Sequence, residues 1–173
     1  MNPKRKLCFG PQHPEINERL FAAHDWYDFY RDYKEAIPVE APTPRRNVVS
    51  THCLVDADHS GDMATRRSHT GVLLFVNKAP IKWYIKKQNN VEKSMFSSGF
   101  IALNTATELV EALWYKLRVF GIPIEGPTNM FCDNEYVYKN SLTPESTFKK
   151  KSVIICYHKF REAVASGVAQ IYK

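Results

Sequence analysis

The sequence predicts an α/β fold, in which a mixed β-sheet carries helices packed on its surface. Three β-rich segments follow one another between residues 48 and 85, and turn-forming residues lie in the connections between them. A helical repeat of apolar residues comes next, and a short apolar strand follows it. A hairpin meander that continues through a crossover helix into another strand produces a sheet with antiparallel and parallel neighbours.

The three strands of the meander are predicted at Val48–Asp56, Gly71–Asn77 and Pro80–Ile85. The first is rich in β-branched residues, which favour the pleated surface of a sheet. Residues 60–62 (Ser-Gly-Asp) and 77–80 (Asn-Lys-Ala-Pro) contain the residue types that form tight turns. The meander is therefore expected to be antiparallel.

A long amphipathic helix is predicted after the meander. Ser97 or Ser98 is a plausible N-cap, and Gly121, followed by Pro123, is a good stop. The apolar residues between them recur at intervals of three and four, which is the repeat of one helix face. They are Leu103, Ala106, Val110, Leu113, Leu117 and Phe120.

The remainder of the chain is predicted to add two strands and two helices. Asn129–Cys132 is a short buried strand, and a helix of about two turns starts at Glu135. Tyr157–Ala165 is a further helix, and Val168–Tyr172 begins a last strand.

Two regions are expected along the 173 residues. Residues 1–45 form a tail and a stiff connector with three prolines at positions 38–44, and residues 46–173 form the domain. No apolar run approaches the ~20 residues of a membrane span. The basic start, residues 1–6, has no apolar stretch behind it, so no signal peptide is expected. We therefore expect an intracellular protein, cytoplasmic or nuclear, with no membrane partner.

The four cysteines do not have the spacing of a zinc site or a redox motif. Cys53 and Cys132 stand in apolar runs and are predicted to be small core residues.

The net charge of +6 favours a polyanionic partner. Lysines are concentrated at positions 78–87, around Trp83 and Tyr84, and a second basic region covers residues 139–161. Lysines contact phosphates, and exposed aromatic rings stack on bases or sugars. A solvated charged face with an inward tryptophan explains the same pattern, so charge alone leaves both interpretations open.

Two predicted strands end on an aspartate, namely Asp56 and Asp133. Neighbouring strand ends bring two carboxylates together, and such a pair attracts a divalent cation. Two magnesium ions about 4 Å apart can activate a water and stabilise the leaving oxygen in phosphodiester hydrolysis. Aspartate also ends strands simply as a turn residue, so this pattern alone has two explanations.

An ordered set of short motifs resembles the ribonuclease H domain of copia-type retrotransposon polyproteins. The motifs run from about residue 20 to residue 172 in the family's order. They lie at residues 25–30 and 35–38, 55–62 and 65–71, 80–84 and 86–88, 131–134, and 157–162.

This resemblance implies a ribonuclease H-like fold and hydrolysis of the RNA strand of RNA–DNA hybrids during reverse transcription. Four acidic residues of the family hold two magnesium (or manganese) ions. Asp56 matches the first and Asp133 the third, while Asp58 is a further polar residue that could reach a metal. The implied partners are an RNA–DNA hybrid or other nucleic acid and the reverse transcriptase portion of the same polyprotein. The nucleic-acid contacts are expected from Arg66, Arg67, Lys86, Lys87, Asn134, Lys149, Lys150, Lys151 and His158.

The sequence departs from the family at its other two acidic positions. Gly99 occupies the glutamate position at the start of the first helix, and Glu92, Glu108 and Glu111 do not substitute for it. The fourth acid follows the last strand in the family, and this chain stops at Lys173, so a C-terminally truncated fold is expected. We therefore expect that magnesium or manganese binds weakly, if it binds at all. We also expect that hydrolysis of the RNA strand is impaired or absent. A non-catalytic nucleic-acid-binding module and a non-functional retrotransposon relic are the alternatives.

Overall fold

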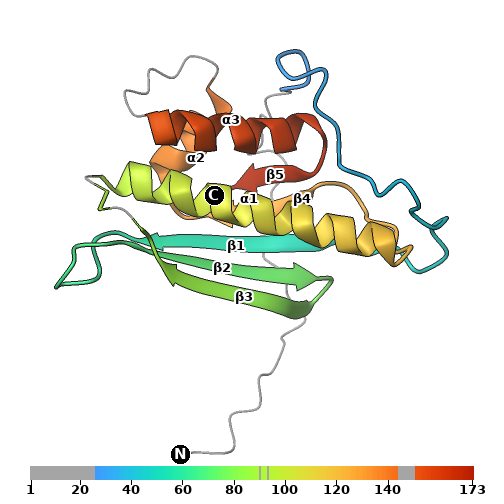
Figure 1. The fold of residues 1–173 in the computed structure, drawn as a ribbon, viewed down its shortest axis with the longest axis horizontal. Coiled ribbons are helices and arrows are strands. Elements are labelled where there is room, and N and C mark those ends of the chain that lie inside the picture. The colour runs from blue at the N-terminus through green and yellow to red at the C-terminus, as the bar shows by residue number, and fades with distance from the viewer. Residues whose placement is uncertain (1–25, 90, 93, 144–150) are drawn as a thin grey trace, which may run out of the picture.

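A computed structural model of the chain describes residues 26–89, 91–92, 94–143 and 151–173, and it contains one five-stranded sheet. The strand order is β3-β2-β1-β4-β5. The long helix α1 crosses one face of the sheet, and α3 runs beside α1 (Figure 1). The strands are β1 (Thr51–Asp58), β2 (His69–Val76), β3 (Ala79–Lys87), β4 (Thr128–Cys132) and β5 (Ala169–Tyr172).

The pairing of the strands confirms the predicted mixed sheet. β1 pairs with β2, and β2 with β3, in the antiparallel sense. β4 pairs with β1 in the parallel sense, and β5 pairs with β4 in the same way. The crossover between β3 and β4 runs through α1, as a parallel connection requires.

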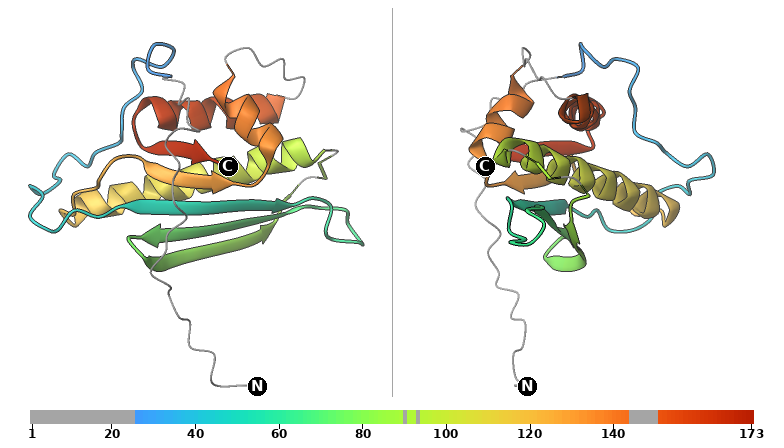
Figure 2. Two further views of the ribbon diagram at one scale, coloured as in Figure 1. Left: turned by 180° about the vertical axis from the view of Figure 1, so that it is seen from behind. Right: turned by 60° about the vertical axis from the view of Figure 1, so that its left-hand side comes forward.

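Alternation of side chains along β1 separates the core from the open face of the sheet. Cys53 and Val55 are buried on the side of α1, whereas Leu54 and Asp56 are exposed on the other side. Seen from behind, the β1–β3 part of the sheet is not covered by a helix among the described residues (Figure 2). The period-2 pattern of the strand therefore places Asp56 on the open face.

Helix α1 spans Met95–Val119 and begins earlier than the sequence predicted. The N-cap is Ser94, whose side chain accepts a hydrogen bond from the Ser97 amide at 3.2 Å, so the prediction of Ser97 or Ser98 was wrong. Ser98 lies inside the first turn, where its hydroxyl donates to the carbonyl of Met95 at 3.0 Å. The apolar repeat used for the prediction begins at Leu103 and does not cover the first two turns of the helix, which explains the error.

The end of α1 is where the sequence predicted it. Gly121 has a φ of +63°, which L side chains rarely adopt, and its amide donates to the carbonyl of Arg118 at 3.0 Å. The amide of Ile122 donates to the carbonyl of Leu117 at 2.9 Å, so the last carbonyls of the helix are satisfied.

Two shorter helices lie between β4 and β5 in the sequence. Helix α2 (Glu135–Leu142) starts at the predicted residue, with Asn134 as its N-cap. Helix α3 (Lys151–Ala165) begins six residues before the predicted Tyr157. Val153 and Phe160, which are both buried, show that the apolar face of α3 reaches back into its first turn. None of the helices among the described residues has the length and apolar character of a membrane span.

Residues 26–45, which we call the N-terminal strap, contain turns but no helix or strand. Trp26 is only 1% exposed, because the Arg161 guanidinium lies 3.5 Å from the centre of its ring and 3.4 Å from that of Tyr157. Burial lowers the pKa of Arg161 to about 10, so this cation remains charged at neutral pH and stacks between two aromatic rings.

The strap also contacts α1. Glu35 accepts two hydrogen bonds from Arg118, at 2.8 and 3.0 Å, and Tyr33 donates to Glu111 at 3.2 Å. The boundary predicted between residues 45 and 46 stays a prediction. The described part of the predicted tail nevertheless packs against both α1 and α3.

Replacing Trp26 by alanine is expected to destabilise the chain strongly, because it removes a buried ring and leaves Arg161 without one of its two aromatic neighbours. Truncation of a buried tryptophan costs about 3–5 kcal/mol, which lowers the melting temperature of a chain of this size by roughly 6–15 °C. The melting temperature is measured by thermal unfolding followed by circular dichroism. Tyr27→Ala, at a neighbouring exposed residue, is the control; equal melting temperatures for both variants would contradict the packing described.

Candidate active site

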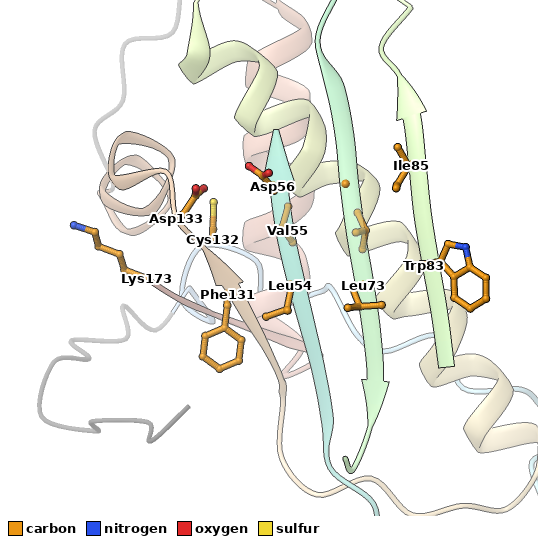
Figure 3. Close-up of a pocket in the computed structure, with 12 residues that line it drawn as sticks. Leu54, Val55, Asp56, Leu73, Trp83, Ile85, Phe131, Cys132, Asp133 and Lys173 are labelled. Carbon is orange, nitrogen blue, oxygen red and sulfur yellow. The ribbon is translucent and has the colours of Figure 1, made fainter. Parts of the chain in front are cut away.

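The parallel pairing of β1 with β4 brings Asp56 and Asp133 to one edge of the sheet. Val55 is the register partner of Cys132, so each aspartate is the residue that follows one member of this pair. Both line a cavity of about 270 Å³, together with Gly99 and Met95 from the start of α1. Figure 3 shows the two carboxylates at the same end of β1 and β4.

The thiol of Cys132 lies between these strand ends. Its side chain is 3% exposed, and this burial raises its pKa to about 11, with the Asp133 and Asp56 carboxylates adding to the effect. Both aspartates are themselves exposed. The site therefore contains two solvent-exposed carboxylates and, beside them, a buried thiol that stays protonated at neutral pH.

Gly99 lies in the same cavity as the two aspartates. The position that the family resemblance gives to a glutamate is thus in the site, and it carries no oxygen there. Asp58, by contrast, lines neither this cavity nor the larger groove described below. Its carboxylate fills the space where a side chain on Gly61 would lie, and it is 3.8 Å from the Nδ1 atom of His69.

The other acidic residues near α1 have structural contacts elsewhere. Glu108 accepts a hydrogen bond from Asn104 at 2.9 Å, and Glu111 accepts one from Lys159 at 2.8 Å. Glu92 is buried, and it does not line the cavity. The structure agrees with the prediction that none of the three substitutes for the missing glutamate.

One carboxylate of the cavity, Glu135, was missed by the sequence reasoning. It stands in the first turn of α2 and lines the cavity with Asp56 and Asp133. Lys139 lies 2.6 Å and Lys173 3.2 Å from its oxygens, and these hydrogen bonds lower its pKa. An acidic residue in the first turn of a helix is explained by the helix dipole alone, so the sequence offered no separate signal for it.

The described residues do not fit a two-metal centre. They contain no group of three or more histidine, cysteine, aspartate or glutamate side chains arranged to hold a metal ion. Asp56 and Asp133 supply two carboxylates, Gly99 supplies none, and Glu135 is paired with two lysines. A pair of divalent cations needs more oxygen ligands than this.

Four predicted nucleic-acid contacts lie at the same end of the sheet as Asp56. Arg66 and Arg67 are exposed in the loop between β1 and β2, and Lys86 and Lys87 are exposed at the end of β3. Lys87 forms an ion pair with Asp62, and this hydrogen bond, with others from Thr65, holds the pKa of the Asp62 carboxyl below its usual range.

The other predicted contacts have different surroundings. Asn134 caps α2, and the ring of His158 is hydrogen-bonded to the hydroxyl of Tyr30 at 2.5 Å, so both have structural roles. Lys151 is exposed at the start of α3. Lys149 and Lys150 lie outside the described residues.

A larger groove, of about 570 Å³, lies on the open face of the sheet beside the aspartates (Figure 3). Trp83 in this groove is 75% exposed, so the alternative in which this tryptophan packs inward is wrong. The groove is lined mainly by apolar side chains, which include Leu54, Leu73, Ile85 and Phe131.

The strand order and the flanking helices define a ribonuclease H-like fold. The fold is similar to that of ribonuclease H1 from Halobacterium salinarum, with a TM-score of 0.51, 13% identity, and coverage of 70% of this chain and 81% of the other. It is also similar to the protease–reverse transcriptase of prototype foamy virus, with a TM-score of 0.52, 12% identity, and coverage of 78% of this chain and 19% of the other.

The sequence relatives are retroelement polyproteins, as the motifs predicted. The chain is 28% identical over 152 residues to the retrovirus-related Pol polyprotein from transposon RE2 of Arabidopsis thaliana, covering 83% of this chain. It is 27% identical over 125 residues to that from transposon RE1 of the same plant, covering 72% of this chain. The chain spans about a tenth of the length of these relatives, 10% and 8%. No protein-family profile matches it. The chain therefore has a ribonuclease H-like fold and is similar in sequence to part of retroelement Pol polyproteins.

The buried thiols are expected to resist alkylation in the folded chain. The pKa is raised by burial to about 11 for Cys132 and Cys156, and further for Cys53, so little thiolate forms at pH 8. Treatment with iodoacetamide at pH 8, followed by peptide mass spectrometry, should show labelling of these three residues only after denaturant is added. Rapid labelling of Cys132 in the native chain would show that the thiol between the aspartates is open to solvent.

Proposed function

We propose that this domain binds nucleic acid of the RNA–DNA hybrid type but hydrolyses it weakly or not at all. The observation that carries the proposal is the composition of the cavity, in which Asp56 and Asp133 lie together and Gly99 stands at the position that the family resemblance gives to a glutamate. The two aspartates are the residues proposed for metal contact and catalysis. The alternatives, a non-catalytic binding module and a retrotransposon relic, share this fold and this cavity.

The missing carboxylate affects both the metal and the reaction. Fewer anionic ligands weaken the binding of a divalent cation, and a displaced cation does not position the attacking water. Two carboxylates allow at most a single, weakly held magnesium or manganese ion. Asp58 is not supported as a further ligand, because its carboxylate lies over Gly61 and not in the cavity.

The basic residues near the cavity support nucleic-acid binding. Arg66, Arg67 and Lys86 are exposed at the end of the sheet where Asp56 lies. Arginine and lysine contacts of this kind go to the phosphate backbone, and an A-form-like hybrid is recognised by its shape and 2′-hydroxyls. Similarity to a viral protease–reverse transcriptase supports a reverse transcriptase region as a further partner. Localisation inside the cell remains a prediction.

Hydrolysis by the unmodified chain is expected to be no faster than hydrolysis by Asp56→Asn. The assay is cleavage of a labelled RNA–DNA hybrid in magnesium or manganese, followed on a denaturing gel. Asp56→Asn removes one of the two carboxylates and is the matched control for contaminating nuclease. Clear cleavage that this substitution abolishes would overturn the proposed impairment.

Binding of the hybrid is expected to weaken steeply as salt rises, because phosphate contacts release counterions. Replacing Arg66 and Arg67 together by alanine should reduce the affinity, and it should reduce the slope of log Kd against log salt by about two. Fluorescence anisotropy measures both quantities. Lys116→Ala, at an exposed lysine near the other end of α1, controls for loss of charge; equal effects per charge would argue against a specific surface.

A further inference from the structure

We infer that the glutamate position, now Gly99, does not merely lack a carboxylate but is closed off by the start of α2, in a close helix–helix contact that we call the glycine notch. The notch consists of Gly99 on α1 and of Asn134 and Val137 on α2. This inference rests on the proposed function, because it explains why a carboxylate at position 99 is excluded. It adds that a single substitution at position 99 does not restore the site.

The distances at Gly99 leave no room for a side chain. A Cβ atom there would lie 2.6 Å from Cγ2 of Val137 and 3.1 Å from Nδ2 of Asn134. Carbon atoms in van der Waals contact are about 3.5–4.0 Å apart. A glutamate at position 99 would therefore have to displace Val137 before its carboxylate could reach the cavity.

Val137 is not free to move aside. Its side chain is fully buried, and its amide donates to the side chain of Asn134 at 3.2 Å, as part of the N-cap of α2. Asn134 also donates to the carbonyl of Met95 at 3.4 Å, in the first turn of α1. Met95 and Gly99 are four residues apart and share one helix face, so Asn134 holds the start of α2 against the same face of α1 that carries Gly99.

The contact couples positions 99 and 137 energetically. Residues whose side chains compete for one space show a non-additive effect on stability, whereas independent sites add. Val137→Ala removes the methyl groups that a Cβ at position 99 would meet. The two substitutions together should therefore be less harmful than the sum of the two alone.

A double-mutant cycle on the full chain tests the notch. The members are the unmodified chain, Gly99→Glu, Val137→Ala and the double variant, each measured by thermal unfolding without metal. Each single substitution should lower the melting temperature by about 3–10 °C. The double variant should lie above the additive expectation by about 3 °C or more. Additivity would overturn the notch.

Gly99→Ala, with and without Val137→Ala, repeats the cycle without adding charge and without the larger side chain. It also keeps the test decisive if Gly99→Glu does not fold, because the same non-additivity is expected from the Cβ alone. Val153→Ala, at a buried valine of α3, is the matched control. A rescue of Gly99→Ala by Val153→Ala as large as that by Val137→Ala would also overturn the notch.

The same variants test whether the notch is what keeps a carboxylate out of the cavity. Manganese chloride alone should raise the melting temperature of the double variant more than that of Gly99→Glu, and Asp56→Asn should remove the difference. An equal rise in the melting temperature of both glutamate variants would contradict the claim that the notch keeps a carboxylate out of the cavity. The coupling between positions 99 and 137 is measured without metal, so it does not depend on nuclease activity. Cleavage of the hybrid by the unmodified chain would therefore contradict the proposed function but not the glycine notch.

Discussion

The parallel pairing of β1 with β4 is the constraint on which the site depends. The pair joins segments more than seventy residues apart, and it aligns Val55 with Cys132. Because parallel strands run to the same edge of a sheet, Asp56 near the end of β1 and Asp133 just after β4 enter one cavity. The pairing in turn needs α1, which carries the chain across the sheet between β3 and β4 and brings Gly99 to the same edge.

The two sides of the cavity differ: the strands present exposed carboxylates, whereas α1 presents a closely packed glycine. On the side of β1 and β4, two carboxylates remain hydrated and close together, as a cation site requires. On the side of α1, the glycine accepts a close approach of α2, which buries Val137 completely. The two strands position the aspartates, while α1 at Gly99 packs closely against Val137 and carries no carboxylate there. A domain with this arrangement can keep its fold and its basic surface without keeping its chemistry.

The contacts of the strap show how far a domain can extend beyond its sheet. Trp26 and Glu35 contact Arg161 and Arg118, which lie more than eighty residues away in the sequence. A proline-rich composition predicts an extended backbone, and this part of the expectation agrees with the absence of helix and strand in residues 26–45. Composition does not show what an extended segment packs against, because the partners are single residues on distant helices.

The sequence by itself determined the mixed sheet, the end of α1 at Gly121, the burial of Cys53 and Cys132, and the placing of Asp56 on one strand of the sheet and of Asp133 directly after another. These follow from local periodicity, turn chemistry and ordered motifs, which act over a few residues. The predicted end of the first strand at Asp56 was wrong, because β1 continues to Asp58. Only the tertiary structure decided that Asn134 and Val137 close over Gly99, that Glu135 is paired with two lysines, and that Trp83 faces an open groove. Each of these depends on side chains brought together by the β1–β4 pairing and the helix packing, and no local pattern specifies which distant atoms will meet.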